Sequence, residues 1–342
     1  MTGARTMNLD GYLVQAWKIS QDEVSLLWAG KKTQLDPHLV QAWKDMKESP
    51  AASVHSDSGI KLVLKTDQTN HIMIYPGAFN PPHRGHVEIL EDGFSNAGPG
   101  LNIVAAVVAP TGDDRLREKE ANRKPPGPSQ NQVTFSQRQR ESLLRDHLSS
   151  RADAKELACK TQVWKFPSLD PFDGYMRLVQ KLAADDGFAI EFVSLKGADH
   201  LTLDKPPKLS SLLDCRAVIF SEISRVNEEA WANGRPTPLK GGWRKWSLVS
   251  RATGRDGVTR SVWRSTLADP AGSEVRLLAD DNAAGKFLTS STAIRGLMMD
   301  PPKGMDSESL AQALGKAGAI SPQTILKYHQ ENCLLSLKGP AQ

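Results

Sequence analysis

Cysteine is scarce in this chain, and that scarcity excludes several kinds of protein. The 342 residues include three cysteines, Cys159, Cys215 and Cys333, which lie far apart. Disulfide-dependent secreted proteins and zinc sites both need cysteines at paired or clustered spacings. We therefore expect neither a disulfide framework nor a zinc site, and we expect a reducing compartment, cytoplasmic or nuclear.

The chain also lacks long hydrophobic runs. No apolar stretch approaches the roughly 20 residues that a helix needs to span a bilayer. Residues 1–10 do not contain the apolar core of a signal peptide. The sequence therefore predicts a protein without a membrane partner.

Charge of one sign is not in large excess either. The chain has 43 Lys and Arg residues against 39 Asp and Glu residues, so the formal net charge is +4. This excess is too small to indicate a nucleic-acid partner, although it is compatible with a local pocket for anionic substrates. With 39% hydrophobic and 24% charged residues, the composition is that of an ordinary globular protein with one large domain, with or without an appendage.

Short apolar runs alternate with amphipathic stretches between residues 71 and 220. The expected strands are 71–75, 103–109, 161–166, 189–195 and 217–220, and the expected helices are 85–94, 135–148, 172–185 and 209–213. This alternation is typical of a parallel sheet with right-handed crossover connections. We predict an α/β fold, a Rossmann-like doubly wound parallel sheet, in which ligands bind at the carboxyl ends of the strands.

Two segments interrupt this alternation, and a helical end follows it. Residues 112–132 are rich in charge, Pro and Gly, which predicts a flexible loop near the site. Residues 225–273 form an irregular insertion whose four tryptophans indicate packing rather than disorder. These tryptophans are Trp231, Trp243, Trp246 and Trp263. The chain then predicts a strand at 275–279 and helices at 290–299, 307–317 and 322–332.

The first 70 residues differ from the rest and contain a near-repeat. The sequence LVQAWK occupies residues 13–18 and again residues 39–44. Two copies are too few for a solenoid, so two amphipathic helices that pack through Leu and Trp are expected. We predict an N-terminal accessory segment, 1–70, before a main domain, 71–335.

The clearest chemical signal follows the first expected strand directly, in the sequence GAFNPPHRGH at residues 77–86. Gly77 allows a tight turn against a phosphate, and Gly85 keeps the start of the next helix open, so that backbone amides can face an anion. His83 and His86 lie three residues apart on one side of the first helical turn. Their imidazoles can donate hydrogen bonds to phosphate oxygens, whereas alone they would equally suit a metal or the surface.

Two further segments place polar groups where an anion could bind. Three hydroxyl residues, Ser290, Ser291 and Thr292, begin an expected helix, with Arg295 one turn inside it, although the same pattern also makes a plain N-cap. Asp199 follows an expected strand in the sequence KGADHL and suits a ribose, a magnesium-bound water or a simple Asx-turn.

These segments together resemble a known family. GAFNPPHRGH is similar to the GxFxPxHxGH signature of the HxGH nucleotidyltransferases, SSTAIR at 290–295 to the SSTxIR of nicotinamide or nicotinate mononucleotide adenylyltransferases, and GAD at 197–199 to their GxD. The tail at 319–328 is more loosely similar to their last helix. The segment at 170–175 departs from the family's substrate-side pattern, and the Trp-rich insertion has no counterpart in it, which leaves the acceptor open.

The resemblance implies an activity, a cofactor and site residues. An acceptor phosphate would attack the α-phosphorus of ATP and release pyrophosphate, with Mg²⁺ bound to the triphosphate. His83, His86 and Arg295 would be catalytic. The nucleotide would contact Gly77, Ala78, Phe79, Gly85, Gly197, Asp199, Ser290, Ser291 and Thr292. The basic residues Lys119, Arg123, Lys124, Arg138 and Arg140 would either close over the phosphates or remain solvated.

Several alternatives stay open. The histidine segment is shared by cytidylyltransferases and phosphopantetheine adenylyltransferases, so another phosphorylated acceptor is one alternative. A nucleotide-binding regulatory protein with reduced turnover is another, and a metal hydrolase is disfavoured because no third ligand has suitable spacing. Homo-oligomers are frequent in the resembled family, but no residue pattern specifies an interface.

Overall fold

The computed structural model describes most of the chain. The described residues are 5–13, 15–16, 62–122, 133–151, 155–164, 170–207, 209, 212–225, 227–253, 258–268, 272–280 and 289–337. Among them, no helix is both long enough and apolar enough to cross a membrane.

The centre of the molecule is an eight-stranded sheet with the order β10-β11-β12-β7-β6-β3-β4-β5. The parallel strands are β3 (Asn70–Gly77), β4 (Asn102–Pro110), β5 (Thr161–Val163), β6 (Ile190–Gly197), β7 (Ala217–Ser221) and β12 (Glu274–Asp280). From β3 the chain first builds outward through β4 to β5, and then returns to build β6, β7 and β12 on the other side. This reversal between β3 and β6 is where open α/β sheets bind ligands.

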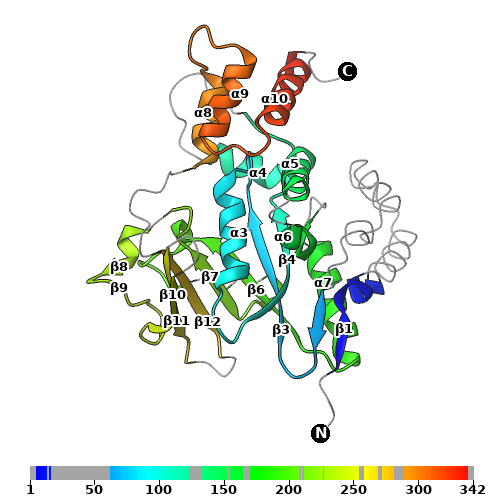
Figure 1. Ribbon diagram of the computed structural model, residues 1–342, viewed down its shortest axis with the longest axis vertical. Coiled ribbons are helices and arrows are strands. Elements are labelled where there is room, and N and C mark those ends of the chain that lie inside the picture. The colour runs from blue at the N-terminus through cyan, green and yellow to red at the C-terminus, as the bar shows by residue number, and fades with distance from the viewer. Residues whose placement is uncertain are drawn as a thin grey trace.

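Helices cover both faces of the sheet (Figure 1). On one face lie α3 (Arg84–Asn96), α5 (Gln137–Ser150) and α6 (Lys155–Lys160), which share a hydrophobic cluster with inward residues of β3, β4 and β6. The other face is covered by α7 (Asp170–Asp185). The predicted fold class, a doubly wound α/β sheet, is confirmed.

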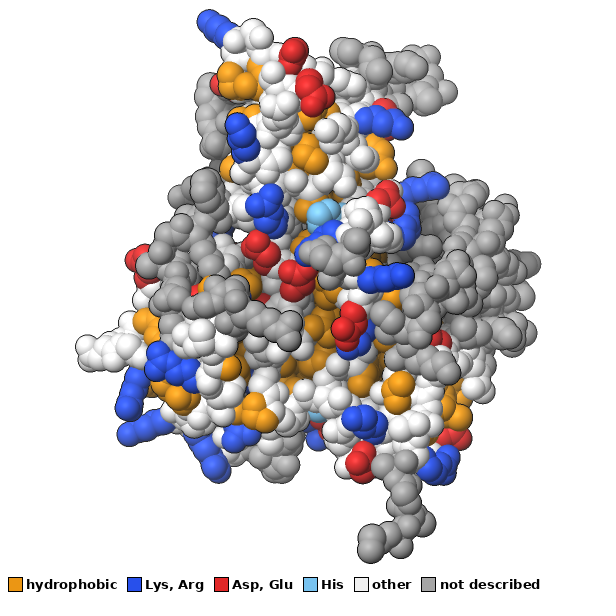
Figure 2. Space-filling model, viewed as in Figure 1, with side chains coloured by type: hydrophobic (Ala, Val, Ile, Leu, Met, Phe, Trp, Pro, Cys, Tyr) orange, Lys and Arg blue, Asp and Glu red, His pale blue; other side chains and the backbone are white. Residues whose placement is uncertain are grey.

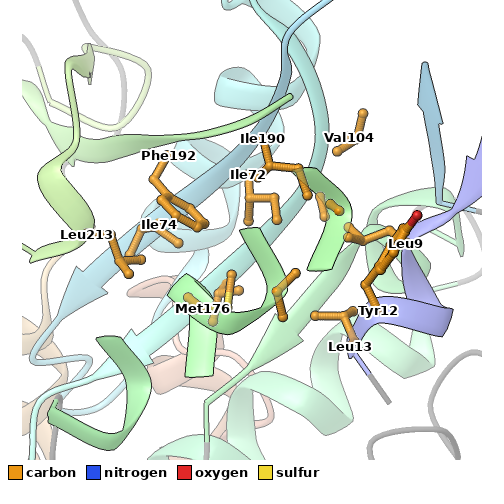
Figure 3. Packing of buried hydrophobic residues seen from close by; sticks show 14 of the residues in the cluster. Leu9, Tyr12, Leu13, Ile72, Ile74, Val104, Met176, Ile190, Phe192 and Leu213 are labelled. Carbon is orange, nitrogen blue, oxygen red and sulfur yellow. The ribbon is translucent and has the colours of Figure 1, made fainter. Parts of the chain in front are cut away.

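The described N-terminal residues join the α7 face. Strand β1 (Thr6–Asn8) pairs with β2 (Val63–Lys65), and the helical residues after β1 bury Leu9 and Leu13 in the cluster beneath α7. Figure 3 shows these residues beside Met176 of α7 and the isoleucines of β3. The second copy of the LVQAWK repeat lies outside the described residues.

The chain ends in three helices that form a separate layer at the top of Figure 1. They are α8 (Ser291–Met299), α9 (Ser307–Lys316) and α10 (Pro322–Leu337). Their cluster includes Ile294, Leu314 and Ile325, and it extends to Phe135 and Leu143 at the start of α5. The helical end was predicted, and this contact with α5 places the start of α8 beside the sheet.

The structure corrects four local predictions. The predicted loop at 112–132 contains the helix α4 (Asp113–Ala121), whose first turn carries two acidic residues that suit a helix N-terminus. The expected strand 161–166 ends at Val163, before Trp164, and the described part of the expected helix 209–213 contains a short 3-10 turn, Leu212–Asp214. Residues 165–166 and 210–211 lie outside the described residues. The insertion at 225–273 is less irregular than expected.

The Trp-rich insertion extends the sheet. It contains the short pair β8 (Trp231–Ala232) and β9 (Arg235–Pro236), followed by β10 (Ser247–Thr253) and β11 (Thr259–Thr266). Strands β10 and β11 run antiparallel, and β11 pairs antiparallel with β12. The prediction missed them because hydrophobic alternation is weak where one strand stands at an exposed edge.

Candidate functional site

A cleft of about 290 Å³ opens at the carboxyl ends of β3 and β6, at the reversal point of the sheet. It is lined by the end of β3 and the loop after it, by the end of β6, and by the start of α8. Eleven of the twelve predicted site residues line it: Gly77, Ala78, Phe79, His83, His86, Gly197, Asp199, Ser290, Ser291, Thr292 and Arg295. The twelfth, Gly85, lies directly behind the lining.

The 77–86 loop is held by an aromatic side chain. Phe79 has a positive φ of 47° and is 1% exposed. Its ring packs edge-on against Tyr75 and His86, at centroid distances of 5.2 and 4.8 Å. A Cβ at position 77 would lie 2.8 Å from this ring, so glycine is needed there. The buried Phe79 side chain therefore shapes the loop, and its backbone remains available to a ligand.

The two histidines stack, and the backbone of His83 fixes the tautomer of His86. Their ring centroids lie 3.7 Å apart, and the backbone N–H of His83 donates to Nδ1 of His86 over 3.1 Å. Because Nδ1 of His86 accepts this bond, a neutral His86 carries its proton on Nε2. That ring can therefore act as a hydrogen-bond donor without carrying a charge.

Both histidines are held in their neutral form. Burial, followed by nearby Arg225, lowers the pKa of His83 to about 4, against the opposing effect of Asp199. Burial, followed by the neighbouring His83, lowers the pKa of His86 well below its usual value. At neutral pH the cleft thus offers two uncharged imidazoles, and an incoming anion would oppose these shifts.

Thr289 is a site residue that the sequence did not predict. Its Oγ1 lies 3.3 Å from Nδ1 of His83, within hydrogen-bonding distance. Two glycines leave the space for it, because a Cβ at Gly85 would lie 2.7 Å from Thr289 Oγ1 and a Cβ at Gly318 would lie 2.3 Å from its Cγ2. Gly318 also has a φ of 90° and accepts a hydrogen bond from the backbone N–H of Arg84.

The start of α8 is hydrogen-bonded to the 77–86 loop. Ser291 Oγ donates to the carbonyl of Pro81 over 2.8 Å, and Nη1 of Arg295 donates to the carbonyl of Asn80. Ser290 is the N-cap, and its side chain accepts from the backbone N–H of Ala293. Two segments some 200 residues apart in sequence therefore form one wall of the cleft.

The end of β6 contributes charged groups. Asp199 forms an ion pair with Arg225, with Nη1 and Oδ2 3.1 Å apart. A Cβ at Gly197 would lie 2.6 Å from Asp199 Oδ1, so glycine lets this carboxylate fold back over the strand end. Lys196 also lines the cleft, and its burial lowers the pKa of its amine.

Four further residues line the cleft although the sequence analysis did not predict them: Lys196, His200, Ser224 and Arg225. Lys196 and His200 flank the GAD segment directly, so their position beside that motif was a usable signal. Arg225 and Ser224 follow β7 closely but match no motif, and only the strand order brings them to the cleft.

The basic residues predicted to close over phosphates divide into three groups. Lys119 of α4 lines the cleft. Arg140 does not, because it is fully buried and donates to the carbonyls of Ala78 and Thr111 and to the carboxylate of Asp113, each over 2.7 Å. Arg138 is exposed and is not part of the lining.

For Arg140 both alternatives, closing over phosphates and remaining solvated, are wrong, because its buried side chain connects α4 to the 77–86 loop. Arg123 and Lys124 lie outside the described residues.

The carboxylate in the lining of the cleft suits a metal ion that arrives with a ligand. Within the described part of the chain, no group of three or more His, Cys, Asp or Glu side chains is arranged to hold a metal. Asp199 is the carboxylate in the lining, and it is already paired with Arg225. Mg²⁺ usually keeps most of its ligands as water and substrate phosphate, so one carboxylate fits it.

Comparisons with known proteins give a distant match. No protein-family model and no curated protein matches the chain in sequence. In structure it is similar to the nicotinic acid mononucleotide adenylyltransferase of Plasmodium falciparum in complex with NaAD, over 78% of this chain and 98% of that one, and to the same enzyme in complex with APC, over 78% and 97%. Both matches have 14% identity and a TM-score of 0.39, which assigns no activity.

Proposed function

We propose that the chain is a nucleotidyltransferase that joins the adenylyl group of ATP to the phosphate of a nicotinamide or nicotinate mononucleotide. The observation that carries this proposal is the convergence of the loop at 77–86, the GAD segment and the start of α8 on one cleft. The cleft contains three histidines and four Lys or Arg side chains against one carboxylate. Such a lining suits a polyphosphate.

The proposed reaction has a simple bond balance. An acceptor phosphate oxygen forms a bond to the α-phosphorus of ATP, the bond from that phosphorus to the bridging oxygen breaks, and pyrophosphate leaves with the electron pair. The attacking phosphate is already ionised at neutral pH, so no protein base is required. Catalysis then consists of holding two anions in line and stabilising the charge that moves to the leaving group.

We assign roles to the cleft residues on this basis. His83 and His86 would donate hydrogen bonds to the triphosphate, and Arg295 would neutralise its leaving end. The backbone at Gly77, Ala78 and Phe79 would line the phosphates, and Gly85, behind them, would keep the start of α3 open toward the nucleotide.

The remaining predicted residues would hold the rest of the nucleotide. The hydroxyls of Ser290 and Thr292 would surround the leaving phosphates, and Ser291 would join them by releasing the carbonyl of Pro81. Gly197 would leave room for the ribose. Asp199 would hold the ribose or Mg²⁺, which when bound would neutralise the triphosphate. Its pairing with Arg225 means that this ion pair must open or shift first.

The identity of the acceptor is a more specific proposal than the class of reaction. The nicotinamide or nicotinate assignment rests on the sequence resemblance of the 290–295 and 197–199 segments. Of the segment 170–175, where that resemblance fails, the described side chains of Asp173 and Tyr175 do not line the cleft. We therefore test the acceptor separately from the reaction.

The test is pyrophosphate release by the purified protein. ATP or CTP is offered with nicotinamide mononucleotide, nicotinate mononucleotide or phosphopantetheine, in the presence of Mg²⁺. Release with ATP and a pyridine mononucleotide is expected. Release only with CTP or another acceptor would keep the reaction class and reject the acceptor.

The matched variants are His86→Ala in the cleft and His147→Ala on α5, outside it. Loss of one charge-stabilising donor lowers turnover by roughly 100- to 1000-fold, which we expect for His86→Ala, while His147→Ala should retain activity. If no pair of substrates reacts although calorimetry detects ATP binding, the proposal fails and a nucleotide-binding regulatory protein is favoured.

A further inference from the structure

Positive charge is concentrated in the Trp-rich segment. Residues 231–268 contain eight Lys or Arg residues and one acidic residue, Asp256, which gives this segment a formal charge of +7. The whole chain carries only +4, so the rest of it is net negative. The small net charge therefore hides a strongly basic region.

Six of these basic residues are exposed, and we call them the basic edge: Arg235, Lys240, Arg244, Lys245, Arg251 and Arg264. Arg235 lies on β9, and the others lie on β10, on β11 and on the loop before β10, which is the last strand at this side of the described sheet. Figure 2 shows blue side chains gathered at the lower left of the molecule, over the part where Figure 1 places β10 and β11. The cleft lies elsewhere, at the ends of β3 and β6.

The centre of the basic edge places two cations between two rings, on a backbone held by hydrogen bonds. In the sequence Trp243-Arg244-Lys245-Trp246 both tryptophans are half-buried and both cations are exposed. The backbone of Arg244 donates to the carbonyl of Thr266 over 2.8 Å and accepts from Ser265 Oγ over 2.6 Å. The indole N–H of Trp246 is bound to the carbonyl of Thr237.

An apolar side chain stands beside these rings. Leu248 is the second residue of β10, and its side chain is 47% exposed. It is one of three exposed large hydrophobic residues in the described part of the chain. In the pairing of β10 with β11, it lies opposite Trp263. Cations, partly exposed rings and an exposed aliphatic group therefore occupy one edge.

We propose that the basic edge binds single-stranded nucleic acid. The cations would neutralise phosphates, and the half-buried rings and Leu248 would contact bases. A seven-residue strand such as β10 is about 23 Å long, enough for several nucleotides. An acidic peptide would use the cations alone, whereas rings that flank exposed cations match a strand that offers both bases and phosphates.

The test measures the fluorescence anisotropy of a labelled oligothymidylate of about 12 nucleotides, at about 50 and about 200 mM salt. One variant reverses three charges of the basic edge, Arg244→Glu, Lys245→Glu and Arg264→Glu. Its control reverses three exposed lysines of the helical end, Lys303→Glu, Lys316→Glu and Lys327→Glu. Circular dichroism and thermal unfolding verify that both variants fold.

We expect the basic-edge variant to bind at least about tenfold more weakly and to reduce the salt slope by roughly two, while the control keeps both. Binding should quench tryptophan fluorescence and persist in His86→Ala, so it is independent of the proposed enzyme activity. Equal loss in both variants, or no binding, would overturn the proposal. Polyglutamate that binds as tightly as the oligonucleotide, without quenching, would assign an acidic protein partner instead.

Discussion

The cleft and the basic edge both present groups that suit anions, but they present them in opposite ways. In the cleft, His83 is 8% exposed and burial keeps both histidines neutral. At the basic edge the cations are exposed, so solvent and salt screen them. The strength of a buried hydrogen-bond donor depends on the residues that contact it. Exposed, screened cations instead each contribute a small part of the total attraction to an anion. Single substitutions should therefore matter in and under the cleft, and only grouped substitutions should matter at the edge.

The largest effect is expected beneath the cleft, at Arg140. Arg140→Met would leave the carboxylate of Asp113 and the carbonyls of Ala78 and Thr111 without their donor. The Arg140 side chain is fully buried but that of Asp113 is 42% exposed, so the cost comes mainly from the two carbonyls left without a donor, at about 1–3 kcal/mol of unfolding free energy each. Arg138→Met, on the same helix but exposed, should change it by less than about 0.5 kcal/mol. Urea unfolding of both variants measures this difference, and equal small effects would show that Arg140 does not hold α4 to the loop.

A smaller effect, visible only in acid, is expected from His83. Its pKa is about 4 in the folded protein and near its usual value of 6.5 when unfolded. Between these values the unfolded chain binds the proton and the folded protein does not, so stability falls as the pH is lowered from 6.5 to 4. This difference in pKa corresponds to a loss of about 3 kcal/mol of unfolding free energy across that pH range.

His83→Asn should remove that part of the acid loss. The measurement is urea unfolding of wild type and variant across this range. Glu222 contributes with the opposite sign, because burial raises its pKa to about 7 and its contribution is lost as the pH rises. Wild type and variant share the contribution of Glu222, so the difference between their unfolding free energies at each pH reports the contribution of His83. Parallel curves would mean that His83 is not held neutral by burial.

The same contrast explains what the sequence could and could not predict. The cleft was predictable because its glycines, histidines and hydroxyls occur in compact segments next to strongly apolar strands such as β3 and β6. Arg140 was placed wrongly because a basic residue near a site has the same sequence signal whether it faces a ligand or is buried beneath it. Its role depends on Thr111 and Asp113, which are brought to it by β4 and α4.

The sheet edge was predictable only in part. Four tryptophans indicated packing, and all four do pack at the cluster formed with β7 and β12. Strands β10 and β11 were missed because polar and basic residues interrupt their alternation, as expected for strands with an exposed face. Thr289 was missed for another reason: its position depends on Gly85 and Gly318, which no local pattern connects.

The smallest effect is expected at Thr289, and it tests whether the buried cleft depends on single hydrogen bonds. Thr289→Val keeps the shape between Gly85 and Gly318 but removes the hydroxyl beside Nδ1 of His83. A hydrogen bond of this kind is worth about 0.5–1.5 kcal/mol, so turnover should fall roughly three- to tenfold, while Thr289→Ser should retain it. Nitrogen NMR shifts of the His83 ring should change in the valine variant only. If they do not change, Thr289 fills space and the proton position of His83 is set by other neighbours.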